Sequence, residues 1–253
     1  MSSETSDPTA PVSPNGAAWT VLTWNVHGSA RPDVEALAAA IRAESPDIVA
    51  LQEIRKRQAA SLAASLQMRF SWSLKHRPYT IAMWWRAEGM AIMTPHLLDA
   101  VGHTEVSDEQ SKRSWSRRIT QWGLVGRADR SMLMIYNLHL SPHADADSRR
   151  DEAARVNALV ATIGDDPPAI VAGDFNDADD PTIIDLLPGV EHVVPPMSNP
   201  ADEPTQLLDH VLLPAHARDV SVSVPAGGAD WAAISDHLPV TVRFALASVT
   251  SGV

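Results

Sequence analysis

The chain has 253 residues, with 20 Lys+Arg against 31 Asp+Glu, a net charge of −11, and no Cys. A composition of 45% hydrophobic and 20% charged residues is typical of a globular protein with a sizeable core and excludes the disordered and fibrous classes. The absence of Cys excludes disulfides, thiolate zinc sites, iron–sulfur clusters and cysteine nucleophiles. The negative net charge argues against polyanion binding driven by overall charge.

The charge is unevenly distributed along the chain. Residues 55–130 contain 13 basic and 6 acidic groups, a local net charge of 13 − 6 = +7, with basic clusters at 55–57 and 112–118. One interpretation is that these clusters are solvated loops or helix faces. The other is that they contact a phosphate-bearing substrate, which requires a catalytic site nearby.

The two ends of the chain predict little structure. Residues 1–18 are rich in Ser, Thr, Pro and Ala and predict a disordered leader, and residues 247–253 predict a flexible tail. Neither a secretory signal pattern nor an apolar run of membrane-spanning length is present. We therefore expect one ordered domain over 19–246, in a cytoplasmic protein without a transmembrane segment that acts as a monomer.

Short apolar runs alternate with longer amphipathic ones between these ends. Runs rich in Val and Ile and bounded by turn residues predict strands at 20–24, 47–51, 119–125, 132–136, 169–173, 209–213 and 239–244, and a hairpin of 79–85 with 89–94. Amphipathic segments predict helices at 32–44, 56–67 and 145–163. Helices mixed with strands favour a single α/β domain with covered sheets.

Polar residues follow the ends of these predicted strands. Any one of the carboxylates could instead be a helix cap, a turn former or an ion-pair partner. Four carboxylates together with two amides and two imidazoles favour a shared crevice at the strand ends. Oxygen ligands without thiolates suit Mg²⁺ or Mn²⁺ rather than a structural zinc. The residues are Glu53, Asp174, Asp209, Asp236, Asn25, Asn176, His139 and His237.

His237 differs from an ordinary strand-end histidine because Asp236 precedes it and Asp209 is available to orient it. A carboxylate that holds an imidazole in one tautomer makes it a competent general base or charge stabiliser. Asn25 and Asn176 do not titrate, so they would orient water, phosphate or a carboxylate. Asn176 could equally serve only to form a turn.

The ordered motifs TWN, LQE, NLH, GDFN, LDH and SDH, which extend from about Trp19 to Phe244, resemble the endonuclease/exonuclease/phosphatase superfamily. The resemblance implies an α/β fold that is a four-layer α/β sandwich, with two mixed β-sheets packed face to face and helices outside. It also implies hydrolysis of a phosphoester by in-line attack of activated water, with a divalent metal, Mg²⁺ or Mn²⁺, as cofactor.

The resemblance further implies a division of roles. Glu53 is expected to be the principal metal ligand, with Asn25 close by and Asp236 as an additional ligand. Asp174 would orient or deprotonate the attacking water, and Asn176 would bind the scissile phosphate. His237, oriented by Asp209, would bind phosphate or act as the general base.

Four further residues complete the predicted site. His139 matches the position at which the nuclease and sphingomyelinase branches carry a histidine that assists the leaving group. Glu88 is similar to the glutamate that pairs with that histidine in the deoxyribonucleases. Arg117 and Arg118, from the second basic cluster, are expected to contact the substrate.

Departures from the family pattern indicate the branch. AP endonucleases usually carry Tyr where this chain has His139, and an acid or amide where it has His27, which also argues against a second metal site. The acidic residues Asp177, Asp179 and Asp180 disfavour a polyphosphorylated inositol as substrate. The chain thus resembles the deoxyribonuclease and neutral sphingomyelinase-like branch.

Two catalytic functions and one non-catalytic function remain open at this point. The first is a metal-dependent phosphodiesterase with nuclease-like activity on DNA or RNA, along which the basic region would track. The second is a hydrolase of a phospholipid head group or a small soluble phosphoester. An inactive scaffold is disfavoured because the acid, amide and imidazole set is complete.

Overall fold

The computed structural model describes residues 18–75, 87–108, 117–142, 145–162, 166–177 and 190–246. The first strand already begins at Ala18, the last residue of the predicted leader. The rest of that leader, the predicted tail and the predicted strand at 79–85 lie outside the described residues. In the described part of the chain, no helix is long and apolar enough to cross a membrane.

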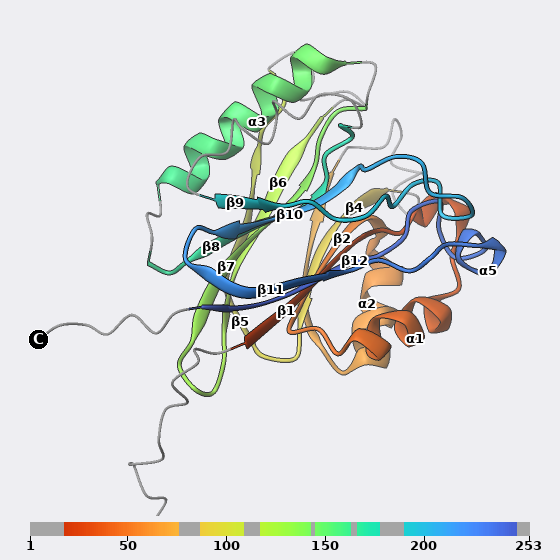
Figure 1. The fold of residues 1–253 in the computed structure, drawn as a ribbon, viewed down its shortest axis with the longest axis horizontal. Helices are drawn as coiled ribbons and strands as arrows, with labels where there is room; N and C mark the ends of the chain where they lie inside the picture. Colours follow the sequence, from red (N-terminus) through yellow and green to blue (C-terminus); the bar gives the residue numbers. More distant parts are fainter. Residues whose placement is uncertain are drawn as a thin grey trace, which may run out of the picture.

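The described strands form two six-stranded sheets that lie face to face (Figure 1). In spatial order the first sheet contains β11 (Ala217–Ser223), β12 (Val240–Leu246), β1 (Ala18–Asn25), β2 (Ile48–Arg55), β4 (Glu88–Thr94) and β3 (Arg69–Leu74). The second contains β5 (Leu97–Glu105), β6 (Ile119–Gly126), β7 (Met132–His139), β8 (Ala169–Asp174), β10 (Asp209–Pro214) and β9 (Val190–Val193).

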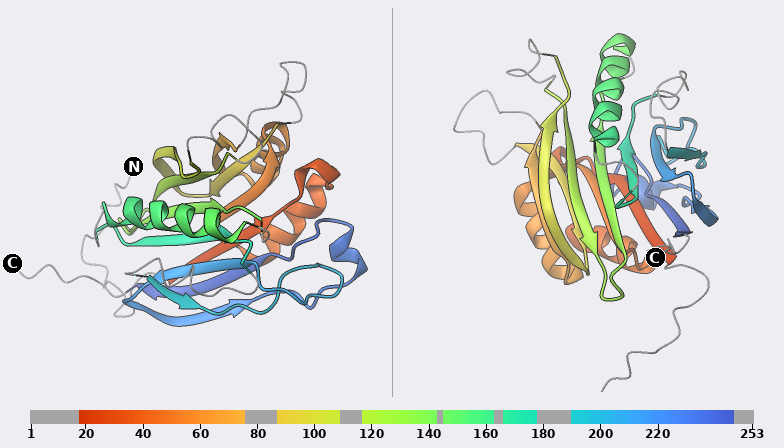
Figure 2. Two further views of the ribbon diagram at one scale, coloured as in Figure 1. Left: turned by 90° about the horizontal axis from the view of Figure 1, so that it is seen from above. Right: turned by 90° about the vertical axis from the view of Figure 1, so that its left-hand side faces the viewer.

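Helices cover the outer faces of both sheets. The helical segments are η1 (Gly28–Ala30), α1 (Val34–Glu44), α2 (Lys56–Leu66), α3 (Ala146–Ala161) and α5 (Ala229–Ala232). The apolar faces of α1 and α2 pack on β1, β2 and β4, whereas α3 packs on β7 and β8 (Figure 2). β1 is parallel to β2 and β7 to β8, and the other pairs are antiparallel. The predicted four-layer sandwich of two mixed sheets is confirmed.

The strands missed by the sequence patterns share one position in the fold. β3, β5, β9 and β11 are the four edge strands of the two sheets. Most residues of β5 and β11 are exposed or only partly buried, so neither strand carries the apolar run that marks an interior strand. β4 pairs with β2 on one side and with β3 on the other.

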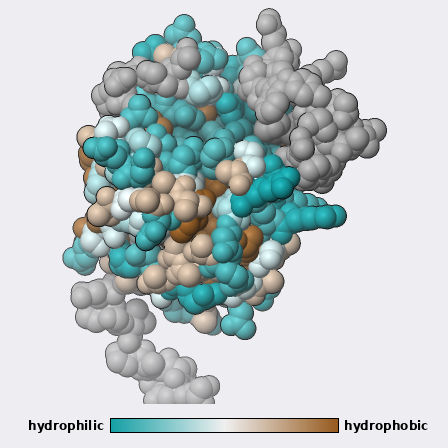
Figure 3. All heavy atoms as spheres, turned by 90° about the vertical axis from the view of Figure 1, so that its right-hand side faces the viewer, coloured by the Kyte–Doolittle hydropathy of each residue, from teal (hydrophilic) through white to brown (hydrophobic). Residues whose placement is uncertain are grey.

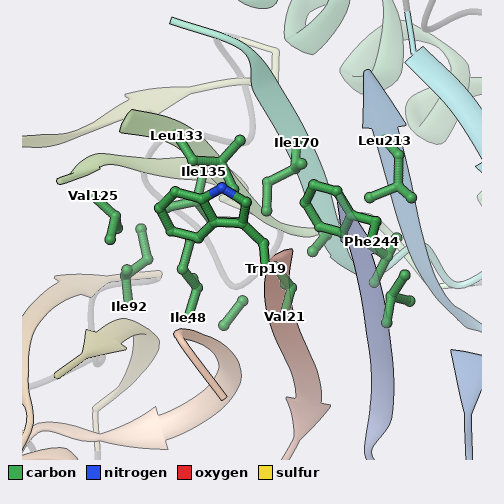
Figure 4. Close-up of a cluster of buried hydrophobic side chains, with 14 of the residues drawn as sticks. Trp19, Val21, Ile48, Ile92, Val125, Leu133, Ile135, Ile170, Leu213 and Phe244 are labelled. Atoms are coloured by element: carbon green, nitrogen blue, oxygen red, sulfur yellow. The ribbon is translucent and has the colours of Figure 1, made fainter. Parts of the chain in front are cut away.

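Alternate residues of the interior strands fill the space between the sheets (Figure 4). Because side chains alternate between the faces of a strand, Trp19 and Val21 of β1 point into this core, whereas Leu22 and Trp24 pack against α1 and α2. Phe244 of β12 lies in the same inter-sheet core. Burial of both faces explains why these strands appear in the sequence as nearly continuous apolar runs.

A layer of buried amides joins the two sheets at the end of this apolar core. Gln52 Nε2 donates to Asn137 Oδ1 at 2.8 Å and to Thr23 Oγ1 at 3.0 Å. Asn137 Nδ2 donates in turn to the carbonyls of Leu51 and Ala91. Cross-sheet hydrogen bonds fix the relative position of the strand ends that lie beyond them.

Candidate active site

Side chains alternate between the two faces of a strand, and in four strands this alternation places polar side chains in one region between the sheets. Asn25 continues the inward-facing row that Trp19 and Val21 begin, and Asp174 continues the row of Ile170 and Ala172. His139 extends the inward row of β7 in the same way, and Asp209 begins the inward row of β10. The hydrophobic pattern that builds the core therefore also positions the site.

Glu53 reaches the site by breaking this alternation. A register shift between Leu51 and Ile54 interrupts the pairing of β2 with β4, and Glu53 has a φ of 56°. Such a bulge changes the direction in which a side chain points. Gly28 packs against the bulge so closely that a Cβ there would lie 2.2 Å from the Glu53 carbonyl oxygen. Gly28, which begins η1, is thus required for this placement.

Asp174 lies at the centre of the cluster and is fully buried. Its Oδ2 accepts a hydrogen bond from Asn25 Nδ2 at 2.9 Å, and its Oδ1 accepts from the backbone N–H of Asn176 at 2.9 Å. The Nε2 atoms of His139 and His237 lie 3.7 and 3.9 Å from Oδ2. Burial raises the pKa of Asp174 to about 6, although the nearby His237 opposes the rise.

His237 is held by Asp209. Its Nδ1 bonds Asp209 Oδ2 at 2.8 Å, and Ser198 Oγ donates to the same oxygen at 2.6 Å. Burial alone would lower the pKa of His237, but the negative charges of Asp209 and Asp174 outweigh burial and raise this pKa to about 10. At neutral pH the ring is therefore an imidazolium whose Nε2–H faces Asp174. It can stabilise a phosphate anion.

Asn176 follows Asp174 in a constrained turn. Its φ is 52°, and its Nδ2 donates to the carbonyl of Leu140. Gly173, with a φ of 150°, passes so near β7 that a Cβ would lie 2.1 Å from the Leu138 carbonyl oxygen. The GDFN segment thus combines a close strand approach with a turn that returns a backbone N–H to Asp174.

Lys75 is a site residue for which no sequence motif gave a signal. It follows β3, is only 4% exposed, and places its Nζ 3.0 Å from His139 Nδ1 and 3.5 Å from Glu53 Oε1. Lys75 thus contacts His139. The resemblance to the deoxyribonucleases instead pairs His139 with Glu88. Glu88 interacts with Glu53 and bonds Ser29, and burial raises its pKa. Burial and the charge of Arg118 lower the pKa of Lys75 to about 8.

The two arginines predicted to bind substrate have different surroundings. Arg117 is buried and engaged with protein groups, since its Nε and NH2 bond Glu105 Oε1 at 2.8 and 2.7 Å and its NH1 donates to the carbonyl of Leu74. Arg118 is also buried, but its Nε has no hydrogen-bond partner among the described residues. Its charge interacts with Glu152, Asp174 and Glu53. Of the two arginines, Arg118 is therefore the one whose guanidinium has a buried donor without a partner among the described residues.

Asp236 and His27 form the more exposed side of the cluster. His27 Nδ1 lies 3.3 Å from Asp236 Oδ2, and both side chains are about half exposed, at 40% and 51%. The nearby α5 projects from the face shown in Figure 3, whose described surface is mainly polar with a smaller apolar band. The cluster is therefore buried at Asp174 and reaches solvent at Asp236.

The donor atoms suit a hard divalent cation. Glu53 and Asp236 offer carboxylate oxygens, and the Asn25 Oδ1 atom, which accepts from the His27 N–H at 3.2 Å, has a second lone pair. Asp174, Asp209 and His237 also bring potential ligand atoms within 4.8 Å of one another. His237 Nδ1 and Asp209 Oδ2 bond each other, however. The ligand atoms of Asp209 and His237 are therefore already paired with each other.

Structures of known proteins share this fold. A protein of the endonuclease/exonuclease/phosphatase family from Leptotrichia buccalis C-1013-b superposes with a TM-score of 0.71 at 19% identity, covering 89% of this chain and 99% of that one. A mannosyl-6-phosphatase from Bacteroides thetaiotaomicron VPI-5482 gives 0.68 at 20%, with 90% and 100% covered. TDP2 from C. elegans gives 0.69 at 19%, with 92% and 76% covered.

The sequence comparisons agree with the fold. No curated protein matches the chain. The sequence model of the Endonuclease/Exonuclease/phosphatase family matches residues 22–237, which include every motif from TWN to SDH. Members of this family hydrolyse phosphoesters, generally with a divalent metal. The chain belongs to the endonuclease/exonuclease/phosphatase family.

Proposed function

We propose that this protein is a divalent-metal-dependent hydrolase that cleaves a phosphodiester by in-line attack of water. The observation that carries the proposal is the position of Asp174, which lies within 4 Å of Asn25, His139 and His237 from both sheets. A phosphoester transition state spreads negative charge over its oxygens, so imidazolium, amide and cation donors are the groups that stabilise it.

Glu53, Asn25 and Asp236 would hold Mg²⁺ or Mn²⁺, which supplies Lewis-acid stabilisation of the phosphate when bound. Asp174 orients the attacking water and accepts its proton, a role that suits a carboxylate whose pKa is raised to about 6. His237, kept protonated by Asp209, and Asn176 bind the non-bridging oxygens. His139 donates to the leaving oxygen as the bond from phosphorus to that oxygen breaks.

A nucleic acid is the first candidate substrate. Lys56 and Arg57 are exposed at the beginning of α2, directly after the strand that carries Glu53. Exposed basic groups beside a phosphoester site can follow a phosphate backbone. Arg117 does not contribute to such a surface because Glu105 and backbone carbonyls engage its guanidinium.

A small phosphoester is the second candidate. It is favoured by the inward-facing cations Lys75 and Arg118, which are 4% and 8% exposed. Buried cations beside the metal ligands can compensate a compact, highly charged group more readily than they can follow a polymer.

A substrate screen tests the proposal. The purified protein is assayed with Mg²⁺ or Mn²⁺ on DNA, RNA, sphingomyelin vesicles, nucleotides and sugar phosphates, together with His237→Ala and a control, Glu44→Gln, whose surface ion pair with Arg243 is remote from the site motifs. We expect hydrolysis of at least one phosphoester, lowered at least about 100-fold by His237→Ala and unaffected by the control. A folded His237→Ala protein with full activity would contradict the assignment. Steep salt dependence on DNA or RNA would identify a nucleic-acid substrate.

A further inference from the structure

The backbone of His237 is held differently from the backbones of the site residues that lie on strands. Strand pairing places four of those residues, which end or begin strands: Asn25, His139, Asp174 and Asp209. His237 lies instead in the turn before β12, and the pairing of β12 with β1 starts only at Val240. A side chain carried by a turn is accurately placed only if other hydrogen bonds fix its backbone.

The end of β1 supplies hydrogen bonds that hold this turn. Trp24 Nε1 donates to the His237 carbonyl oxygen at 2.8 Å in a buried contact. Ser235 Oγ donates to the Asn25 carbonyl oxygen at 2.7 Å, and the N–H of His237 donates to the same hydroxyl at 3.3 Å. The last two residues of β1, Trp24 and Asn25, thus bind the turn that carries His237.

Core packing alone does not account for the hydrogen bond of Trp24. Trp19 and Trp24 lie on the same strand, and both are fully buried. Trp19 Nε1 has no hydrogen-bond partner among the described residues, so the core accepts an indole whose N–H is unpaired. Trp24 packs on the other face of β1, against α1 and α2, with its ring centroid 6.0 Å from that of Trp231 in an edge-on arrangement. These contacts fix the ring and therefore the direction of its N–H.

His237 is therefore held at two points by the two sheets. Asp209 of the second sheet bonds the ring at Nδ1, at 2.8 Å, and Trp24 of the first sheet bonds the backbone carbonyl. The other ring nitrogen, Nε2, lies 3.9 Å from Asp174 Oδ2. Without the bond to the carbonyl, the backbone could shift and the ring could turn about its contact with Asp209. A displacement of about 1 Å at a reacting centre can lower a rate about 100-fold.

We propose that Trp24 is a positioning residue that holds the backbone of His237 through its indole N–H and thereby keeps Nε2 of this imidazole directed at the substrate phosphate. The inference rests on the proposed function for the role of His237 in binding phosphate. Trp24 packs on the outer face of β1 and acts only through the His237 carbonyl. Its neighbour Asn25 points to the inner face and bonds Asp174.

Matched aromatic variants test this role. Trp24→Phe keeps an aromatic ring and removes the N–H donor, and Trp19→Phe makes the same change on the same strand at an indole without a described partner. Replacement of Trp24 by 3-benzothienylalanine, in which sulfur takes the place of the N–H, removes the donor and keeps the shape of the side chain. His237→Ala and its double variant with Trp24→Phe complete the set. Each protein is assayed with Mg²⁺ or Mn²⁺ on the phosphoester that the wild-type protein hydrolyses fastest, and urea unfolding measures its stability.

We expect Trp24→Phe and the benzothienyl protein to lower kcat/KM at least about 10-fold. Trp19→Phe should lower the urea midpoint, because it leaves a cavity in the core, but should keep the wild-type kcat/KM. In the His237→Ala background, Trp24→Phe should change kcat/KM by no more than about 2-fold, because Trp24 acts through His237. Wild-type kcat/KM in the benzothienyl protein, an equal loss in Trp19→Phe, or losses that multiply in the double variant would overturn the proposal.

A measurement without turnover separates this inference from the proposed function. The amide N–H of Leu238 belongs to the same peptide group as the His237 carbonyl, so its signal in ¹⁵N–¹H spectra of the metal-free protein reports on the hydrogen bond from Trp24. Trp24→Phe should shift this signal, and Trp19→Phe should leave it in place. An unchanged Leu238 signal in Trp24→Phe would overturn the positioning role even if the enzyme is active. A wild-type protein that shows the shift on mutation but hydrolyses no phosphoester would instead overturn the proposed function and the role of His237 at a phosphate.

Discussion

Asp47 and Asp174 are two carboxylates at opposite ends of the same pair of sheets, and their environments shift their pKa values in opposite directions. Asp47 contacts the N–H of Thr20 near the beginning of β1, whereas Asp174 contacts Asn25 at its end. The Asp47 carboxylate is ion-paired with Arg127 and bonds His96 and the Thr20 N–H. Asp174 is more deeply buried and shares its surroundings with another carboxylate, Asp209.

Both carboxylate oxygens of Asp47 have hydrogen-bond or ion-pair partners. His96 Nε2 lies 2.7 Å from Asp47 Oδ1, Thr20 N–H donates to Oδ2 at 2.8 Å, and Arg127 NH2 bonds the same oxygen while its guanidinium lies 4.0 Å above the Trp19 ring. Burial alone would raise the pKa of Asp47, but these hydrogen bonds outweigh it and lower the pKa. The cluster ties β6 of one sheet to β1 and β2 of the other, and it stabilises the fold.

The Asp174 cluster is arranged for a different purpose. Burial raises the pKa of Asp174 to about 6, so the ionised folded state carries a cost that the Asp47 cluster does not. Asp209 Oδ1 is likewise buried without a hydrogen-bond partner among the described residues. A buried carboxylate with a shifted pKa, in contact with other acids, amides and imidazoles, is typical of a catalytic site. The difference distinguishes a carboxylate that stabilises the fold from one that we propose to be catalytic.

The largest expected effect is on activity, and it should appear at only one of the two carboxylates. Asp174→Asn should lower phosphoester hydrolysis at least about 1,000-fold, because it removes the group that we propose orients and deprotonates water. Its free energy of unfolding should change by less than about 1 kcal/mol, since the variant also removes a costly buried charge. Steady-state kinetics and urea unfolding measure the two effects.

Asp47→Asn should show the reverse pattern. Loss of the carboxylate leaves Arg127 and His96 with a weaker partner, so unfolding should become easier by about 2–3 kcal/mol. The activity per folded molecule should remain at the wild-type level. An Asp47→Asn protein that is stable but inactive, or an Asp174→Asn protein that is active, would remove the distinction between the two clusters.

The pH dependence of stability should differ in sign between the clusters. The lowered pKa of Asp47 contributes stability that is present above the ordinary carboxyl range and is lost as the pH falls through its folded pKa, so the deficit of Asp47→Asn should shrink on acidification. The pKa of Asp174 is raised from 3.8 to about 6, so the wild-type protein should lose stability relative to Asp174→Asn as the pH rises across that interval. Urea unfolding with EDTA between pH 4 and 7 measures the Asp174 effect, and the same measurement below pH 4 measures the Asp47 effect. Profiles of the same sign would show that the two shifts are not opposite.

The smallest expected effect concerns an exposed ion pair. Arg243 NH2 bonds Glu44 Oε2 at 2.7 Å, but both side chains are substantially exposed to solvent. Glu44→Gln should therefore change the free energy of unfolding by no more than about 0.5 kcal/mol. A loss as large as that of Asp47→Asn would show that burial does not decide the strength of these contacts.

Much of the fold could be predicted because the interior strands are buried on both faces. β1, β2, β7, β8, β10 and β12 each carry a run of apolar residues that marks them in the sequence. The edge strands β5 and β11 lack such a run because solvent covers much of them, and their pairing is decided by their neighbours. Tertiary context outweighed local pattern at the edges.

Some residues of the candidate site could likewise be predicted from the sequence, and others could not. Asn25, His139, Asp174 and Asp209 end or begin strands, so the alternation that buries the core also brings them together. The direction of Glu53 depends on a bulge, which the sequence does not mark. Lys75 lies in no sequence motif. Arg117 belongs to a basic cluster that predicts substrate contact, and its contact with Glu105 is seen only in the structure. Roles set by long-range contacts could not be inferred from neighbouring residues.

We propose that the end of the sandwich around Glu53 and Asp174 is a metal-dependent phosphoesterase site. The most direct test measures phosphoester hydrolysis by EDTA-treated wild-type and Glu53→Gln proteins while Mg²⁺ or Mn²⁺ is titrated back. We predict that EDTA abolishes wild-type hydrolysis, that either cation restores it, and that folded Glu53→Gln remains at least about 100-fold less active at every cation concentration. Full hydrolysis in EDTA, or a Glu53→Gln titration curve that matches the wild-type curve, would contradict the claim.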